Sequence, residues 1–313
     1  MNGAGRRGLL GMDSVRLDRN WTCFCPSERR RQALAAAAAY AEGKAARLGT
    51  GRGTTFSVST PFGMVVCREY RHGGILAGLT GGVFRGKRRF LLEVSALNKA
   101  RAASVAVPRG VGVLVKNLGA GLTRGILMTE WIENAGDLLT LLREGTLTDG
   151  TLRKIARETG LQVRRLHDAG LRHPDLHLKN VLYSPASPES PVWLIDFDKA
   201  GAAGALSERA RAADLARLWR SWEKLRESGE GLPETLPRRF LAAYAGKERN
   251  RLHRTAAEIG RRRLRIGLSA LRWRFLRARG RQPYARPRNA TGPGGKGFKT
   301  RPGTEGKRSD SGA

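Results

Sequence analysis

The chain has 313 residues, of which 40% are hydrophobic, so it can form one two-lobed domain or two small domains with an ordinary core. Its 58 Lys and Arg against 27 Asp and Glu give a formal net charge of +31, which favours polyanionic partners such as nucleic acid, anionic lipid or a phosphorylated substrate. No apolar run is long enough to span a membrane, no secretory signal follows Arg6 and Arg7, and the three cysteines match neither a disulfide framework nor a zinc site, so we expect a cytoplasmic protein.

The first 44 residues show little strand pattern, and we predict that they form an N-terminal extension. Residues 29–48 have helical spacing, and Gly49 is predicted to end that stretch. The extension is therefore expected to be partly helical and to precede the main fold.

Residues 45–130 are predicted to form a β-rich lobe, because short apolar runs alternate there with glycine turns. The predicted strands cover residues 54–59, 64–70, 111–115 and 126–132. A helix at residues 88–103 interrupts them, since its apolar residues recur at helical spacing. The apolar face of this helix consists of Phe90, Leu91, Val94 and Leu97.

Residues 131–255 are predicted to form a largely helical lobe. Its helices are expected at residues 137–143, 151–169, about 207–227 and 235–245, with two short apolar runs at 181–183 and 192–197. The helix at 151–169 should bury one stripe of residues, namely Leu152, Ile155, Thr159, Val163 and Leu166. The predicted fold class is thus α+β, with a β-rich lobe followed by a helical lobe.

The basic C-terminal segment, residues 256–313, is predicted to lie outside both lobes. Residues 251–313 contain 18 Lys and Arg against 3 Asp and Glu. An apolar stripe at helical spacing consists of Leu264, Leu268, Leu271 and Phe275, and the sequence beyond Gly280 has the composition of a disordered tail. Two interpretations stay open: an amphipathic helix that docks on an anionic membrane, or a packed C-terminal helix with a solvated tail. Nucleic-acid binding is disfavoured, because aromatic residues are sparse beyond Phe275.

Residues 173–180, His-Pro-Asp-Leu-His-Leu-Lys-Asn, have the pattern H-x-D-x-x-x-x-N. Asp175 is predicted to be the catalytic base that accepts the proton of an acceptor hydroxyl, and Asn180 to reach a nucleotide-bound Mg²⁺ ion. Sixteen residues after Asn180, Asp196 follows an apolar run, and its carboxylate is predicted to be the principal Mg²⁺ ligand. The order and separation of these residues predict a protein-kinase-like phosphotransferase that uses ATP and Mg²⁺.

The phosphates of ATP are expected to meet two features of the β-rich lobe. Gly51, Arg52 and Gly53 precede its first strand, in a glycine-rich stretch whose backbone can approach phosphate closely. Arg68 stands where kinases carry a phosphate-pairing lysine, and an arginine can bridge phosphate and carboxylate in the same way. Arg71 remains an alternative for that role.

Glu93, on the predicted helix 88–103, is the expected ion partner of this arginine, because its apolar neighbours indicate a position near the core. Glu130 and Ile132 lie at the junction of the two lobes, and their backbone is predicted to bind adenine. This assignment rests on position in the sequence alone.

Several positions depart from the pattern of eukaryotic protein kinases. Pro174 follows the histidine in place of an arginine, Asp198 replaces the glycine of Asp-Phe-Gly, and no Ala-Pro-Glu motif follows. Control by phosphorylation of an activation segment is therefore not expected. These departures favour a small or carbohydrate acceptor over a protein.

With these residues assembled, the sequence resembles the bacterial 3-deoxy-D-manno-octulosonic acid (Kdo) kinase family, within the lipopolysaccharide kinase group, over roughly residues 45–245. The stretches that carry the resemblance are Gly-Arg-Gly-Thr-Thr at 51–55, Arg-Glu-Tyr-Arg-His-Gly-Gly at 68–74, Leu-Met-Thr-Glu-Trp-Ile-Glu-Asn-Ala at 127–135, Leu-His-Asp at 166–168, the segment 173–180 and Trp-Leu-Ile-Asp-Phe-Asp-Lys at 193–199. The second and the last of these are the more specific to the family.

The resemblance implies ATP-dependent phosphorylation of a hydroxyl of Kdo in Kdo–lipid A, during lipopolysaccharide inner-core biosynthesis at the cytoplasmic face of the inner membrane. By the same carry-over, Asp175 is the base, Asn180 and Asp196 bind Mg²⁺, and Arg68 with Glu93 positions phosphate. Two alternatives remain: a kinase of heptose, another small molecule or a protein, and a non-catalytic kinase-fold module that binds anionic membrane or RNA. The presence of all three motif residues favours catalysis.

Overall fold

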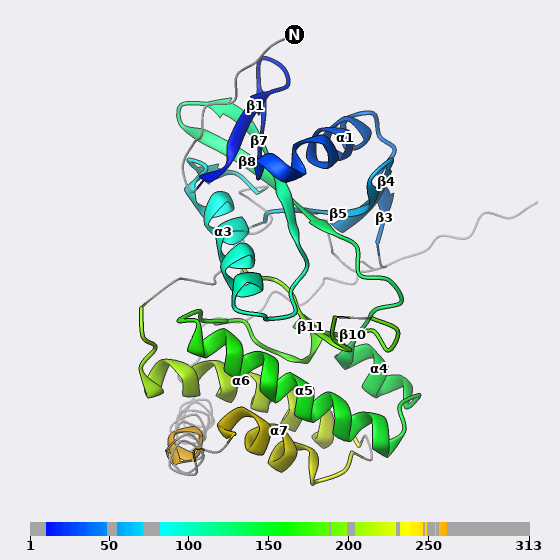
Figure 1. Cartoon of the computed structure of the whole chain (residues 1–313), viewed down its shortest axis with the longest axis vertical. Coiled ribbons are helices and arrows are strands. Elements are labelled where there is room, and N and C mark those ends of the chain that lie inside the picture. The colour runs from blue at the N-terminus through cyan, green and yellow to red at the C-terminus, as the bar shows by residue number, and fades with distance from the viewer. Residues whose placement is uncertain are drawn as a thin grey trace, which may run out of the picture. The chain divides into compact units, whose positions relative to one another are not determined.

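The computed structural model describes residues 11–48, 55–71, 82–187, 189–198, 204–229, 232–246, 248, 254 and 257–261. All of them belong to one compact unit, Met1–Arg265. Figure 1 shows a β-rich lobe in its upper part and a helical lobe below it. The predicted α+β, two-lobed, kinase-like architecture is therefore confirmed.

The first lobe is built on an antiparallel sheet. Its strands are β1 Asp13–Arg16, β2 Trp21–Cys25, β3 Ala46–Arg47, β4 Thr55–Thr60, β5 Gly63–Glu69, β6 Phe84–Arg85, β7 Gly110–Gly119 and β8 Leu122–Glu130. They lie in the order β1-β2-β7-β8-β5-β4-β3, and β6 pairs with β8. Because β5 pairs with β8 from Val65 opposite Glu130 to Glu69 opposite Ile126, the predicted phosphate-binding strand lies beside the strand that leads to the second lobe.

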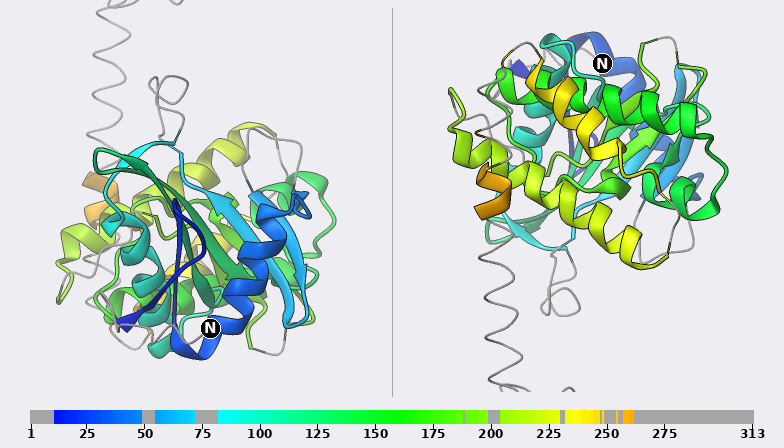
Figure 2. Two further views of the ribbon diagram at one scale, coloured as in Figure 1. Left: turned by 90° about the horizontal axis from the view of Figure 1, so that it is seen from above. Right: turned by 90° about the horizontal axis from the view of Figure 1, so that it is seen from below.

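Two helices, α1 (Arg30–Ala41) and α3 (Arg88–Ala102), pack on opposite faces of this sheet (Figure 2). Successive side chains of a strand point to opposite faces, so Leu114 joins the core cluster of α1 whereas Val113 and Val115 join that of α3. The apolar face predicted for α3 is buried. The three free cysteines lie in the core cluster between α1 and the sheet.

The structure differs from the prediction for the first 44 residues, which are part of the lobe and not an extension. Strands β1 and β2 form a hairpin, and β2 pairs with β7 from Trp21 opposite Lys116 to Phe24 opposite Val113. These strands are short, and their stability depends on pairing with a strand far away in the sequence, which local patterns do not reveal. The helix also ends earlier than predicted, at Ala41, because Gly43 adopts the left-handed conformation (φ 73°) that terminates helices.

The second lobe consists of helices around a small sheet. Its elements are β9 Gly136–Asp137, α4 Leu138–Glu144, α5 Asp149–Asp168, the 3₁₀ turn η3 Leu178–Asn180, β10 Val181–Tyr183, β11 Val192–Leu194, α6 Glu208–Glu227 and α7 Leu236–Ala245. The three strands lie in the order β11-β10-β9. The side chain of Thr148 caps α5 by accepting a hydrogen bond from the N–H of Thr151.

Helix α5 is the central element of this lobe, and its predicted stripe from Leu152 to Leu166 is buried. Helix α7 packs closely against α5 at Gly160, where an added Cβ would lie 2.4 Å from the carbonyl oxygen of Phe240. Glycine thus allows the two helix backbones to approach.

The predicted basic segment begins inside the compact unit. Residues 257–261 are helical, and Ile259 is buried in the main core cluster, so the boundary predicted at residue 255 lies too early. The apolar stripe from Leu264 to Phe275 and the tail beyond it lie outside the described residues. Within the described part of the chain, no helix has the length and apolar character needed to cross a membrane.

Candidate active site

The start of the loop 173–180 is hydrogen-bonded to Asp214, a buried carboxylate on α6. The backbone N–H of His173 donates to Oδ2 of Asp214 at 2.8 Å, and Arg172 reaches Oδ1 at 2.6 Å. Asp214 is 1% exposed. Burial acts to raise the pKa of this carboxyl, but hydrogen bonds from His167, Arg172 and the backbone of His173 outweigh it and lower the pKa below its ordinary value. Asp214 is therefore a buried anion that orients the loop.

The His173 side chain connects the loop to the residue before Asp196. Its Nε2 lies 2.9 Å from the carbonyl oxygen of Ile195, so this nitrogen carries the proton and donates it. Burial lowers the pKa of His173, which keeps the ring neutral. The ring also packs against Phe197, with 5.0 Å between centroids. The histidine of the motif thus joins the loop of Asp175 to the segment that carries Asp196.

Asn180 is oriented by the backbone on both sides. Its Nδ2 donates to the carbonyl oxygen of Asp175 at 3.0 Å, and its own carbonyl accepts a hydrogen bond from the N–H of Ile195 at 3.0 Å. The second bond brings it beside the segment that carries Asp196. The side-chain oxygen of Asn180 is left as a potential metal ligand.

The carboxylate of Asp175 is contacted by two side chains of the helical lobe. Arg217 of α6 forms an ion pair through Nη2 with Oδ1 of Asp175, and Nε2 of His177 lies 3.9 Å from the same oxygen. This oxygen is buried and accepts no hydrogen bond from the described residues, so its contact with Arg217 is ionic. The sequence analysis assigned no role to Arg217.

Asp196 adopts a left-handed backbone conformation, with φ 66°. A non-glycine residue reaches this region at a cost, and such outliers gather at functional sites. Phe197, which is fully buried, anchors the next position in the core. The Asp196 carboxylate is partly exposed, and its Oδ1 lies 3.6 Å from Nη2 of Arg68. The backbone turn therefore leaves this carboxylate available to a ligand.

Arg68 and Glu93 form the predicted ion pair, with Nη2 and Oε1 2.6 Å apart. The hydroxyl of Tyr70 donates to the other oxygen of Glu93 at 2.6 Å. Burial raises the pKa of Glu93, and the charge of Arg68 partly opposes that rise. Arg71, the alternative cation, is instead 58% exposed and 3.6 Å from Glu69. The structure therefore pairs Glu93 with Arg68.

A second contact joins α3 to the loop that carries Asp196. Arg89 donates from Nε to Oδ1 of Asp198 at 2.7 Å and from Nη2 to Oδ2, a bidentate arrangement. Asp198 is thus bound to the same helix that carries Glu93. The sequence prediction assigned no role to Arg89, and the unusual aspartate after Phe197 was the only signal of such a partner.

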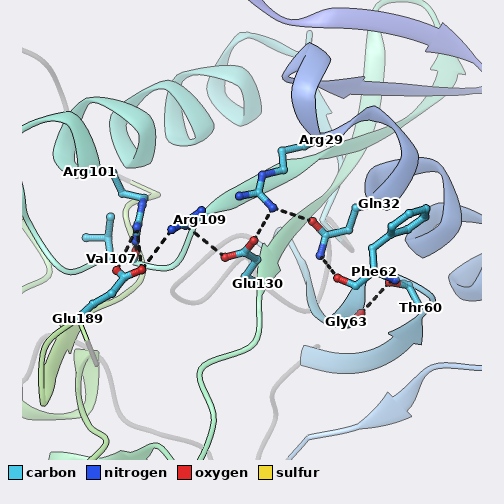
Figure 3. A network of polar contacts seen from close by, with 10 residues as sticks. All are labelled: Arg29, Gln32, Thr60, Phe62, Gly63, Arg101, Val107, Arg109, Glu130 and Glu189. Carbon is cyan, nitrogen blue, oxygen red and sulfur yellow. Dashed lines mark hydrogen bonds and ion pairs between the residues drawn. The ribbon is translucent and has the colours of Figure 1, made fainter. Parts of the chain in front are cut away.

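Glu130 belongs to a polar network that joins the two lobes (Figure 3). Its carboxylate lies 2.6 Å from Arg29 and 3.6 Å from Arg109, and Arg109 also reaches Glu189, between β10 and β11, at 3.2 Å. Arg101 of α3 pairs with Glu189 at 3.0 Å.

The backbone N–H of Glu130 donates to the carbonyl of Arg109. That N–H is therefore already used, and binding of adenine by the backbone of Glu130 and the partly buried Ile132 stays a prediction.

The structure brings five of the predicted site residues together. Asp175 and Asn180 share a hydrogen-bonded loop, and Arg68 links Glu93 to Asp196. Gly51, Arg52 and Gly53 lie outside the described residues. Asp214, Arg217 and Arg89 join the site from positions that no spacing rule connects to it, although Asp214 and Arg217 share one helix at a spacing of one turn.

The donor set of the site fits Mg²⁺ and nucleotide phosphates. An amide oxygen and a carboxylate are hard oxygen ligands, and Mg²⁺ usually takes one or two carboxylates and completes its shell with phosphate oxygens and water. Among the described residues, no cluster of three or more His, Cys, Asp and Glu could hold a metal unaided.

Comparison with known proteins yields one family. Residues 37–244 match the Lipopolysaccharide kinase (Kdo/WaaP) family. The 3-deoxy-D-manno-octulosonic acid kinase of Vibrio cholerae serotype O1 is 37% identical over 58% of this chain and 75% of that protein. Its namesake from Actinobacillus succinogenes is 32% identical over 69% of this chain and 86% of that protein. Among solved structures, WaaP in complex with acyl carrier protein is 20% identical, with a TM-score of 0.46, over 69% of this chain and 87% of that chain, and this distant likeness adds nothing to the assignment.

Proposed function

Because the chain belongs to the lipopolysaccharide kinase (Kdo/WaaP) family and is thus a phosphotransferase of lipopolysaccharide biosynthesis, we propose that it transfers the γ-phosphate of ATP to a hydroxyl of Kdo in Kdo–lipid A. The choice of Kdo is supported by the names of the similar proteins from Vibrio cholerae and Actinobacillus succinogenes. The observation that carries the proposal is the hydrogen-bonded loop of Asp175 and Asn180, joined through Ile195 to the segment of Asp196.

In this proposal, the Asp175 carboxylate accepts the proton of the acceptor hydroxyl as its oxygen bonds to the γ-phosphorus. The bond from that phosphorus to the bridging oxygen breaks, and ADP leaves. Asn180 and Asp196 hold Mg²⁺, which neutralises phosphate charge when it is bound. The role of His173 and Asp214 is to keep the base-bearing loop in place before the substrates arrive.

The remaining nucleotide contacts are assigned to the first lobe. Arg68, oriented by Glu93, pairs with phosphate oxygens, and the backbone of Gly51, Arg52 and Gly53 covers the phosphates. The adenine is bound by the backbone of Glu130 and Ile132. The support for the Arg68 assignment is its position between Glu93 and Asp196.

We place the protein at the cytoplasmic face of the inner membrane, as a peripheral protein. The support is the net charge of +31 and the 18 Lys and Arg among residues 251–313, since each basic residue near an anionic surface contributes about 1 kcal/mol. Sedimentation of the full-length protein with phosphatidylglycerol vesicles, but not with phosphatidylcholine vesicles, tests this, and high salt should release it. Equal sedimentation with both vesicle types would contradict electrostatic docking.

Transfer of labelled phosphate from ATP to Kdo–lipid A, with Mg²⁺ present, tests the activity directly. We expect the wild-type protein to label the acceptor and Asp175→Asn to lose about 10²–10⁴-fold in kcat. Asp149→Asn provides a matched control, because Asp149 lies at the exposed start of α5 and should leave turnover unchanged. The proposal fails if the wild-type protein does not label Kdo–lipid A, or if Asp175→Asn remains fully active. Labelling of a heptose acceptor alone would retain the kinase and overturn the choice of Kdo.

A further inference from the structure

Among the described residues, an arginine of the helical lobe forms an ion pair with the proposed base. Arg217 of α6 lies in the turn after Asp214, the carboxylate that holds the catalytic loop. The hydrogen bond from His173 to Asp214 fixes α6 beside the loop, and this places Arg217, one turn further along the helix, next to Asp175. The side chain of Arg217 nevertheless remains 43% exposed.

The other arginines of the site are differently placed. Arg89 and Arg172 are paired with Asp198 and Asp214, carboxylates that serve the framework of the protein. Arg68 lies between Glu93 and Asp196, on the side proposed for the nucleotide. Arg217 is paired with Asp175, the carboxylate that must face the acceptor hydroxyl in the proposed reaction. Arg217 is thus the cation of this group that lies where an acceptor would bind.

The guanidinium group can serve two anions at once. It has five N–H donors in a flat fork, and the contact with Asp175 is made through Nη2. The remaining donors can form the charge-assisted, two-pronged hydrogen bonds that arginine makes with a carboxylate. A ligand bound in this way would lie directly beside the base.

We propose that Arg217 binds the carboxylate of a sugar-acid acceptor and thereby selects acidic over neutral sugars. The inference rests on the proposed function, in which the acceptor Kdo is such an acid. The carboxylate would be held by the exposed edge of Arg217, and a hydroxyl of the same sugar would face Asp175. Arg217 is therefore assigned as a specificity-determining residue on the acceptor side.

The test compares two acceptors in detergent micelles: Kdo–lipid A and the same glycolipid with its Kdo carboxylate methylated. Wild-type protein should prefer the free acid by about 10–100-fold in kcat/KM, the usual effect of one charge-assisted contact. Arg217→Gln should lose that preference by slowing transfer to the acid while changing transfer to the ester less than about 3-fold. Arg217→Lys, which retains the charge but not the fork, should retain part of the preference.

Arg220→Gln is the matched control, because Arg220 is an exposed arginine of the same helix and the change in charge is identical. It should preserve the preference for the acid. The affinity of each variant for an ATP analogue, measured separately, should equal that of the wild type.

The inference is overturned if Arg217→Gln slows transfer to the acid and the ester equally, because the arginine would then serve another anion, such as a lipid A phosphate. A loss of ATP affinity in Arg217→Gln would assign it to the nucleotide and also overturn the inference. If the wild-type protein labels neither acceptor, the proposed function itself fails. An active wild-type protein without a preference for the acid refutes only the role of Arg217.

Discussion

Arg89 on α3 and Asp198 on the loop that carries Asp196 form a bidentate ion pair between residues 109 positions apart in the sequence. The same helix carries Glu93, the partner of Arg68, so two ionic contacts connect α3 with the residues around Asp196. Asp198 stands where protein kinases have a glycine after the phenylalanine. Its carboxylate has a structural partner in Arg89, which connects this loop to α3.

We predict that Arg89→Gln and Asp198→Asn each lower kcat/KM about 10-fold and raise the Mg²⁺ concentration needed for half-maximal rate. The physical reason is that either change releases the loop that carries Asp196. Because both residues form one contact, the double variant should be no slower than either single variant. Arg88→Gln, at the exposed neighbouring position, is the control. Additive effects in the double variant would show that the two side chains act separately.

Replacing Arg68 by methionine should destabilise the fold by about 3–5 kcal/mol, because it leaves the buried Glu93 without its counter-charge. Arg71→Met, which removes an exposed arginine nearby, should cost less than about 0.5 kcal/mol. Urea unfolding of the two variants measures the difference. A large loss in Arg71→Met with none in Arg68→Met would contradict the pairing.

The cost of Arg68→Met should also depend on pH. Burial already raises the pKa of Glu93 above its ordinary value of 4.5, and removal of Arg68 should raise it further. A raised pKa in the folded state gives a stability contribution that is complete below the unfolded pKa and is lost as pH rises through the folded one. The destabilisation should therefore be greater at about pH 8 than at about pH 5. Equal values at both would show that Glu93 stays ionised.

Asp214 should have the opposite pH dependence. Its pKa is lowered in the folded state, because hydrogen bonds to the carboxylate outweigh the effect of burial. Its contribution is present above the unfolded value of about 3.8 and is lost as pH falls through the folded pKa. Asp214→Asn should lower stability at neutral pH by about 2–4 kcal/mol and flatten the decline of stability in acid. An unchanged acid limb in urea unfolding would count against this role.

Two glycines of α5 provide a matched test of helix packing. At Gly160 an added Cβ would lie 2.4 Å from the carbonyl oxygen of Phe240, whereas at Gly150 the nearest atom is 3.9 Å away. Gly160→Ala should destabilise the protein by about 1–3 kcal/mol through overpacking. Gly150→Ala should stabilise it by up to about 1 kcal/mol, because alanine favours the helix. Thermal unfolding measures both, and a stabilising Gly160→Ala would mean that α7 is free to move away.

Much of the helical framework could be predicted from the sequence. The buried faces of α3 and α5 follow from apolar residues repeating at helical spacing, and burial of Phe90 and Val163 agrees with it. The start of α6 was predicted close to residue 207, where Ser207 is the cap. The strands β1 and β2 were missed, because β2 joins the sheet by pairing with β7, a strand about ninety residues away, and β1 pairs only with β2.

The sequence by itself predicted the chemistry of the candidate site, because Asp175, Asn180 and Asp196 lie within one short stretch whose spacing is set by a loop, a hairpin and a turn. Only the tertiary structure decided which cations serve those carboxylates. It paired Arg68 instead of Arg71 with Glu93, and it brought Arg217 and Arg89 to the site from other helices. Local spacing predicts contacts within an element or a turn, whereas these ion pairs arise from the packing of α3 and α6 against distant loops. The partners of the motif residues therefore depended on the fold.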